Sequence, residues 1–130
     1  MISIILPCYN EENSIEINIS KIKEELVKIN KEFEIIVVDD GSTDSSKKKL
    51  KNLDIKLLSH PHNMGYGAAL KTGIKNSKFD TIVISDIDGS YPPKHIPDLI
   101  NIYEESFQEG NGFDMVVGAR KGKEYDGSFM

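Results

Sequence analysis

The sequence predicts an α/β fold, an open and mainly parallel sheet flanked by helices. Short apolar runs alternate along the chain with segments whose apolar residues recur at helical spacing. A strand, a helix of about 17 residues and a second strand form a βαβ unit, whose strands run parallel with a right-handed crossover. Because ligands of such sheets bind outside the carboxyl ends of the strands, we expect a site in the loops that follow the strands.

The strands are expected where apolar runs end at turn residues. They cover Ile2–Leu6, Phe33–Val38, Ile55–Leu58, Thr81–Ser85 and Met115–Val117. The first helix follows Asn13, which stands three residues before Glu16 in a capping-box-like pattern. Its apolar stripe falls at spacings of four, three, four and three residues: Ile15, Ile19, Ile22, Leu26 and Ile29. Later helices are expected over Ser45–Leu53, Ala68–Asn76 and His95–Phe107, and an irregular tail over 121–130.

Length and composition describe one soluble, folded domain over residues 1–130. Apolar residues make up 38% of the chain and charged residues 28%, which suits a modest core. A net charge of −5 and a pI near 5.2 leave no basic excess to neutralise phosphates, which argues against a nucleic-acid partner. No apolar run reaches the roughly 18 residues of a membrane span, and no signal peptide is recognisable, so we expect a cytoplasmic protein.

The single cysteine, Cys8, cannot build a disulfide framework or a zinc site alone, which favours a reducing compartment. We expect its side chain to be a small buried filler rather than a nucleophile, because no histidine adjoins it in the sequence.

Two carboxylates follow the fourth expected strand, at Asp86 and Asp88. Side chains one residue apart in a loop can converge on one point, where their charges repel unless a cation joins them. Hard oxygen ligands suit Mg²⁺ or Mn²⁺. The alternative is a solvated acidic turn or a helix cap, which is the usual meaning of an isolated D-x-D.

Two more exit loops carry residues suited to a nucleotide. Gly65 and Gly67 allow the backbone to approach a ligand closely before a helix, although a plain turn explains them equally well. Asp39 and Asp40 can accept N–H or O–H groups from a nucleobase or ribose. They also resemble the acidic cluster of a phospho-acceptor signalling domain, but the spacing to the second acidic pair disfavours that interpretation.

Five segments lie in order on the expected loops: P-C-Y-N-E-E at Pro7–Glu12, V-D-D-G-S-T-D at Val38–Asp44, N-M-G-Y-G-A-A-L-K-T-G at Asn63–Gly73, S-D-I-D-G-S-Y-P-P at Ser85–Pro93 and V-G-A-R at Val117–Arg120. Together they resemble the family-two nucleotide-sugar glycosyltransferases, and most closely the dolichyl- or polyprenyl-phosphate sugar transferases. The resemblance covers the chain up to Arg120, and it implies a GT-A fold, which is Rossmann-like.

For the nucleotide, the resemblance implies contacts from the first two exit loops. Pro7, Tyr9 and Glu11 would line the base and the ribose. Asp39 and Asp40 would hold the base, with Asp40 as the direct contact.

For the diphosphate, the resemblance implies that Asp86 and Asp88 hold Mg²⁺ or Mn²⁺, with Asp88 assigned to catalysis through this metal. Neutralising a leaving diphosphate in this way is an electrostatic role. The chain departs from the mannosyltransferase-like members at Ser90, where a glutamine often helps to bind the metal. Arg120 would touch the phosphates or an anionic acceptor, and a surface arginine at a strand end is an equal alternative.

The resemblance implies transfer of a sugar, with inversion, from a UDP- or GDP-sugar to a lipid-phosphate or saccharide acceptor, in cell-envelope polysaccharide synthesis. Such a transfer needs a general base, and we find no match for one. We expect the base beyond Met130, in an acceptor-binding half that this chain lacks. The longer form would associate with the cytoplasmic face of a membrane, and an exposed apolar surface on this half would favour a homodimer.

Two alternatives to an active transferase stay open. The first is a non-catalytic module or fragment that binds a nucleotide-sugar but lacks the base. The second is a nucleotidyltransferase, which is disfavoured because the loop after the first strand is acidic and carries no glycine-rich, basic triphosphate motif.

Overall fold

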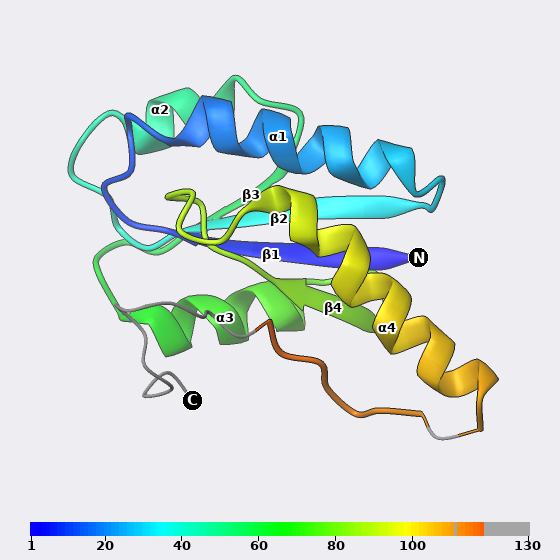
Figure 1. The fold of residues 1–130 in the computed structure, drawn as a ribbon. Helices are drawn as coiled ribbons and strands as arrows, with labels where there is room; N and C mark the ends of the chain where they lie inside the picture. Colours follow the sequence, from blue (N-terminus) through cyan, green and yellow to red (C-terminus); the bar gives the residue numbers. More distant parts are fainter. Residues whose placement is uncertain (111, 119–130) are drawn as a thin grey trace, which may run out of the picture. The chain divides into compact units, whose positions relative to one another are not determined.

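Four parallel strands form the sheet of the computed structural model, which describes residues 1–110 and 112–118. They are β1 (Ile2–Cys8), β2 (Phe33–Asp39), β3 (Lys56–Ser59) and β4 (Thr81–Ile84). Their order across the sheet is β3-β2-β1-β4 (Figure 1). The chain builds outward from β1 to β3 and then returns to the other side of β1, so the strand order reverses between β1 and β4.

Helices cover both faces of this sheet. Helix α1 (Ile15–Lys28) and the short α2 (Ser46–Lys51) lie on one face, and α3 (Tyr66–Lys75) lies on the other (Figure 1). The sequence-based expectation of a parallel α/β sheet is confirmed. The expected capping box is wrong, because Ser14 is the N-cap and makes no side-chain capping bond. The backbone N–H groups of Ser14 and Ile15 instead donate to the Glu11 carbonyl.

The core lies where β1 and β2 pack between the two helical layers. Both strands are almost entirely buried, as expected for parallel strands covered on both faces. Helix α3 approaches β1 closely at Gly73, where an added Cβ would lie 2.6 Å from Cγ2 of Ile5. Ile36, Val38 and Ala69 form a buried cluster between β2 and α3, so α3 packs directly against the sheet.

The chain divides into two compact units, Met1–Lys94 and His95–Met130. The second unit contains α4 (Ile96–Gln108), where the rings of Tyr103 and Phe107 meet edge to face with centroids 5.1 Å apart. A 3₁₀ turn (Pro93–His95) bridges the boundary between the units. The expectation of one domain over 1–130 stays a prediction, and Arg120 and the tail 121–130 lie outside the described residues.

The expected fifth strand is wrong. Residues 115–117 have no strand hydrogen bonding, and the side chains of Met115 and Val117 are 75% and 63% exposed. An apolar triplet forms a strand only when a neighbouring strand supplies its hydrogen bonds, and these residues have no such partner in the described structure. Within the described ranges, no helix combines the length and the apolar character needed to cross a bilayer.

Candidate functional site

A cavity of about 270 Å³ opens at the carboxyl ends of the strands, in the first unit. It is lined from the exit loops of β1, β2 and β4 and from the start of α3, around the point where strand order reverses. The predicted site residues that line it are Pro7, Tyr9, Glu11, Asp40, Gly65, Asp86 and Asp88. Asp39 and Gly67 are not among its lining residues, and Arg120 lies outside the described residues.

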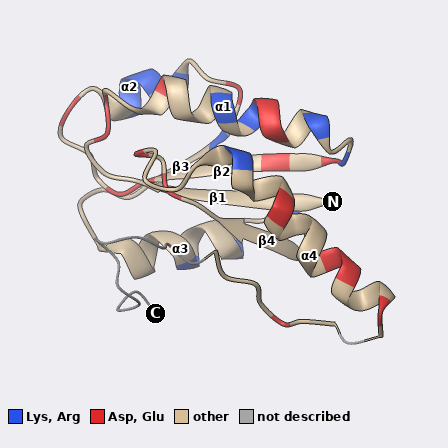
Figure 2. Ribbon diagram, in the orientation of Figure 1, with Lys and Arg blue, Asp and Glu red and all other residues tan. Residues whose placement is uncertain are grey.

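Acidic residues gather at this edge of the sheet. Figure 2 shows them in the loops that follow β1 and β2, whereas α1 carries both lysines and acidic residues. Glu11 and Asp88 line the same cavity, and burial together with the charges of Asp88 and Asp44 raises the pKa of Glu11. The cavity therefore gathers negative charge, which favours a cation together with any anionic ligand.

The turn after β4 is organised by Ser90. Its hydroxyl donates to Asp86 Oδ2 at 2.7 Å, and its backbone N–H donates to Asp88 Oδ1 at 2.8 Å. Gly89 has a φ of +83°, a left-handed conformation that glycine adopts without strain. One serine thus holds a carboxylate oxygen of each aspartate and fixes the pair in one turn.

A buried asparagine on α1 also supports the turn that follows β4. Asn18 is 9% exposed, and its Nδ2 donates to the carbonyl of Ile87 at 3.0 Å. A Cβ on Gly89 would come within 3.2 Å of the Asn18 amide, so the turn packs directly on this side chain. Ile87, between the two aspartates, is itself 2% exposed. The D-x-D backbone is therefore anchored to a helix rather than left as a free loop.

Two carboxylates are enough for a divalent metal that is shared with a ligand. Among residues 1–110 and 112–118, no group of three or more His, Cys, Asp or Glu side chains is placed to hold a metal ion by itself. Mg²⁺ sites at phosphates commonly use one or two carboxylates, with phosphate oxygens and waters as the other ligands. Asp86 and Asp88, held in one turn beside the cavity, fit that arrangement.

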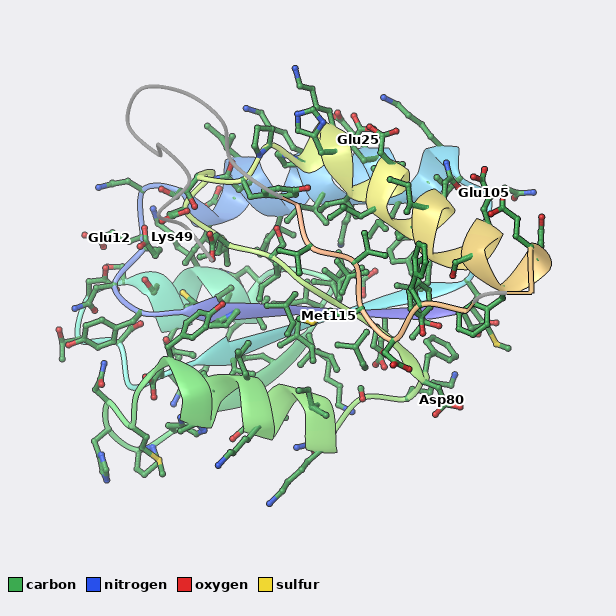
Figure 3. The ribbon with its side chains drawn as sticks, turned by 60° about the horizontal axis from the view of Figure 1, so that its bottom comes forward. Glu12, Glu25, Lys49, Asp80, Glu105 and Met115 are labelled. Carbon is green, nitrogen blue, oxygen red and sulfur yellow. The ribbon has the colours of Figure 1, made fainter. Side chains whose placement is uncertain are left out.

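The exit loops of β1 and β2 are fastened to each other. Asn10 Oδ1 accepts from the backbone N–H of Thr43 at 2.8 Å, and Ser46 Oγ accepts from the backbone N–H of Glu11 at 2.9 Å. Lys49 adds a 2.6 Å bond from its Nζ to the Glu12 carbonyl, and Figure 3 shows these two residues side by side. These bonds fix the backbone on either side of Glu11 before any ligand arrives.

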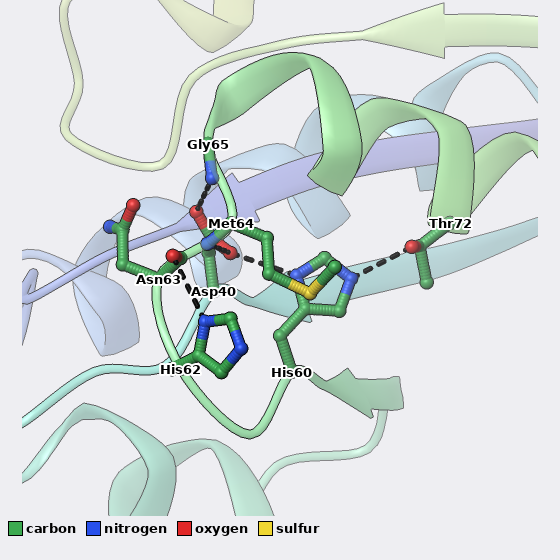
Figure 4. Close-up of polar contacts among 7 residues, drawn as sticks. All are labelled: Asp40, His60, His62, Asn63, Met64, Gly65 and Thr72. Carbon is green, nitrogen blue, oxygen red and sulfur yellow. Dashed lines mark hydrogen bonds and ion pairs between the residues drawn. The ribbon is translucent and has the colours of Figure 1, made fainter.

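Asp40 holds the loop between β3 and α3 (Figure 4). Its Oδ1 accepts from the backbone N–H of Met64 and from Nδ1 of His60, both at 2.8 Å, and its Oδ2 accepts from the backbone N–H of Gly65 at 2.9 Å. Nε2 of His60 lies 2.8 Å from Oγ1 of Thr72 on α3. Burial alone would raise the pKa of Asp40, but these hydrogen bonds and the nearby His60 outweigh burial and lower it.

Asp39 and Cys8 lie side by side at the ends of β2 and β1. Asp39 is 1% exposed, and its Oδ1 has no hydrogen-bond partner among the described residues. Burial, followed by the charge of Asp39, raises the pKa of the Cys8 thiol to about 12. Cys8 is buried as the sequence predicts, and a thiol that stays protonated is a poor nucleophile.

The sequence analysis missed Asn18, His60 and Asn63 as site residues. Asn18 supports the D-x-D turn, His60 binds Asp40, and Asn63 lines the cavity. A signal for Asn18 was present, because it is a polar residue inside the apolar stripe of α1. Asn63 opens the segment Asn63–Gly73 that carries part of the family resemblance, whereas His60 acts through a contact with Asp40 that no local pattern indicates.

With this geometry established, comparison with known proteins identifies the family. The model of "Glycosyl transferase family 2" matches residues 3–130, and the chain belongs to this family. A dolichol-phosphate mannosyltransferase from Pyrococcus furiosus is 33% identical over 123 residues, which cover 92% of this chain and 33% of that protein.

Two solved structures share the fold, which is that of the GT-A glycosyltransferases. A mannosyltransferase from Pyrobaculum calidifontis, solved with GDP-Man and Mn²⁺, is 28% identical with a TM-score of 0.63, over 72% of this chain and 29% of that chain. A glucosyl-3-phosphoglycerate synthase from Mycobacterium tuberculosis, solved with Mn²⁺, UDP and phosphoglyceric acid, is 31% identical with a TM-score of 0.64, over 78% and 38%. The chain spans between 33% and 39% of the length of the curated relatives it matches.

Proposed function

We propose that this chain binds the donor of an inverting glycosyl transfer, a UDP- or GDP-sugar, with a divalent metal in the cavity at the carboxyl edge of the sheet. One observation carries the proposal. The Asp86–Asp88 turn and the Asp40–Gly65 contact line the same cavity, across the point where the strand order reverses. In one cavity, a carboxylate pair that can bind a metal suits the diphosphate of a nucleoside diphosphate, and the Asp40 carboxylate suits its base.

At the base end, Asp40 is the acceptor for the nucleobase. It lines the cavity, whereas Asp39 does not. Its hydrogen bonds favour the ionised carboxylate, which is the better acceptor of an N–H group. Tyr9 is 44% exposed at the same cavity, and its ring offers a face for the base or the ribose. Pro7 and Glu11 complete this side of the site.

At the diphosphate end, Asp86 and Asp88 would hold Mg²⁺ or Mn²⁺. The metal supplies positive charge that stabilises the leaving diphosphate, a contribution worth on the order of several kcal/mol of activation free energy. Ser90 keeps the two carboxylates in one turn, and Asn18 keeps that turn against α1. Mn²⁺ in the two solved relatives supports this assignment.

For the acceptor, we propose a lipid phosphate, by similarity to the dolichol-phosphate mannosyltransferase, with a saccharide as the second choice. Such an acceptor lies at a membrane, so the reaction belongs to the cytoplasmic face of one. We assign no general base among the described residues. A homodimer and a contribution of Arg120 to phosphate or acceptor binding also stay proposals.

The test is calorimetric titration of UDP and GDP into the 130-residue chain, with Mn²⁺ or with EDTA. We expect one nucleotide to bind only with Mn²⁺, and Asp88→Ala to abolish that binding. Asp80→Ala is the matched control, because Asp80 is exposed and precedes β4 at the opposite end of the strand from Asp88. Failure of both nucleotides to bind the folded chain in Mn²⁺ contradicts the proposal.

Turnover separates the proposal from its alternatives. Slow release of free sugar from the donor, without an acceptor, indicates a transferase site that can reach the reaction's transition state. Binding without any hydrolysis indicates a non-catalytic module. Release of pyrophosphate from a nucleoside triphosphate and a sugar phosphate would support a nucleotidyltransferase instead.

A further inference from the structure

The cavity is acidic, and among the described residues that line it there is no lysine, arginine or histidine. Its carboxylates are Glu11, Asp40, Asp86 and Asp88. A divalent metal offsets the charge of the Asp86–Asp88 pair and binds some of the diphosphate oxygens. The remaining diphosphate oxygens still carry negative charge and lose water in the cavity, so they need hydrogen-bond donors from the protein.

The neutral side-chain donors of the cavity are two phenols and one amide, those of Tyr9, Tyr66 and Asn63. Tyr66 is the donor that lies near the metal end. Burial, followed by the charge of Asp86, raises the pKa of the Tyr66 phenol, so the ring stands close to that aspartate. A phenol that keeps its proton at neutral pH is a hydrogen-bond donor.

The first turn of α3 directs Tyr66 into the cavity. Gly65, Tyr66 and Ala69 all line it, whereas Gly67 does not, as expected for residues three and four apart on one side of a helix. Ala69 is fully buried against β2, and the Gly65 N–H donates to Asp40 at 2.9 Å. The backbone of Tyr66 is therefore fixed on both sides, while its side chain stays open to a ligand at 57% exposure.

We propose that the hydroxyl of Tyr66 donates a hydrogen bond to the diphosphate of the nucleotide-sugar. The inference rests on the proposed function, in which a metal on Asp86 and Asp88 holds that diphosphate. The metal occupies lone pairs of Asp86, so the neighbouring Tyr66 O–H finds its acceptor on the diphosphate, one metal ion away. Negative charge grows on the diphosphate as the bond to the sugar breaks, so this hydrogen bond strengthens in the transition state.

Two variants separate the hydroxyl from the ring. Tyr66→Phe removes one oxygen and keeps the ring, whereas Tyr66→Leu removes both. The probe is UDP or GDP, whichever binds the unmodified chain in Mn²⁺, titrated by calorimetry. We expect both variants to bind it at least about tenfold more weakly, because a hydrogen bond to a charged group is lost in each.

The matching nucleoside, uridine or guanosine, locates the lost contact along the ligand. It keeps the base and the ribose but lacks the diphosphate, and ligand-observed NMR measures its weak binding. We expect Tyr66→Phe to change nucleoside affinity by less than about twofold, since no donor to the base or ribose is removed. Tyr103→Phe is the matched control, because Tyr103 does not line the cavity and its variant keeps the ring that meets Phe107.

Three results overturn the inference and leave the proposed function intact. In the first, Tyr66→Phe binds the nucleotide as tightly as the unmodified chain, whether or not Tyr66→Leu does. In the second, Tyr66→Phe loses nucleoside affinity by the same factor as nucleotide affinity, which places the contact at the base or ribose. In the third, Tyr103→Phe shows an equal loss. Failure of both nucleotides to bind the unmodified, folded chain in Mn²⁺ overturns the proposed function as well.

Discussion

Nδ2 of Asn18, on helix α1, donates a 3.0 Å hydrogen bond to the carbonyl of Ile87, the residue between Asp86 and Asp88. The two partners stand 69 positions apart in the sequence. A helix on one face of the sheet thereby sets the position of the loop that carries both candidate metal ligands. The orientation of those carboxylates depends on this bond as well as on Ser90.

Replacing Asn18 is expected to weaken the metal end of the site. Asn18→Leu keeps the size of the side chain but leaves the buried Ile87 carbonyl without its donor, so we expect a loss of about 1–3 kcal/mol in unfolding free energy. The concentration of Mn²⁺ needed for half-maximal binding of the nucleotide should rise. Asn13→Leu, at an exposed position just before α1, is the control. An unchanged Mn²⁺ requirement, together with the loss of stability, would make Asn18 a purely structural residue.

Two glycines near the site should respond to alanine in opposite ways. Gly41 has a φ of +74°, and a Cβ there would lie 2.3 Å from the backbone carbon of His62. Gly41→Ala should therefore cost more than about 2 kcal/mol of unfolding free energy. Gly67 stands in the first turn of α3 with nothing within 4 Å of its Cβ position, so Gly67→Ala should stabilise by about 0.5–1 kcal/mol. Chemical denaturation measures both.

Gly67→Ala also tests the sequence-based expectation that Gly67 lets a ligand approach the backbone. Because Gly67 does not line the cavity, we expect UDP affinity in this variant to match that of the unmodified chain. A marked loss of UDP affinity in Gly67→Ala would show that Gly67 lies against the bound nucleotide.

The ionised form of Asp40 should contribute stability that acid removes. Its pKa is lowered in the folded chain, so the contribution is complete above the unfolded value near pH 4 and is lost as pH falls through the folded value. The stability difference between the unmodified chain and Asp40→Asn should thus shrink below about pH 4. The pKa of Asp44 is also lowered, but Asp44 is present in both proteins and cancels in the difference.

Thermal melting between about pH 3 and pH 7 measures this difference. Asp80→Asn, at an exposed position away from the site, is the control for replacing an aspartate by asparagine. A difference for Asp40→Asn that grows in acid would contradict the account.

Cys8 should be inert in the folded chain. Burial raises its pKa to about 12, so at about pH 8 almost no thiolate is present to react. A thiol-exchange reagent should label the native chain at least about a hundredfold more slowly than the chain in denaturant. Rapid, stoichiometric labelling of the native protein would show that β1 opens readily at its carboxyl end.

Much of the fold is predictable because buried parallel strands are continuous apolar runs. Ile2–Leu6 and Phe33–Val38 were located within two residues of their observed ends for that reason. The order β3-β2-β1-β4 is not encoded in any one segment, since it depends on how the crossovers pack. The prediction of a strand at Met115–Val117 is wrong because strand-forming residues need a partner strand as well as propensity.

The site was predictable to the extent that its residues follow strands directly. Asp86 and Asp88 stand in an exit loop, and every parallel strand delivers its exit loop to the same edge of the sheet. His60 and Asn18 act instead through contacts with residues 20 and 69 positions away. Such contacts are set by tertiary packing, so the chain has to be folded before they can be recognised.

The most direct test of the central claim is an anomalous difference map from crystals of the chain grown with UDP and Mn²⁺. The account predicts a manganese peak within coordination distance of Asp86 or Asp88 and of the diphosphate, with the base beside Asp40. A manganese peak at another group of side chains, or a nucleotide bound outside the cavity that Tyr9 and Gly65 line, would contradict it.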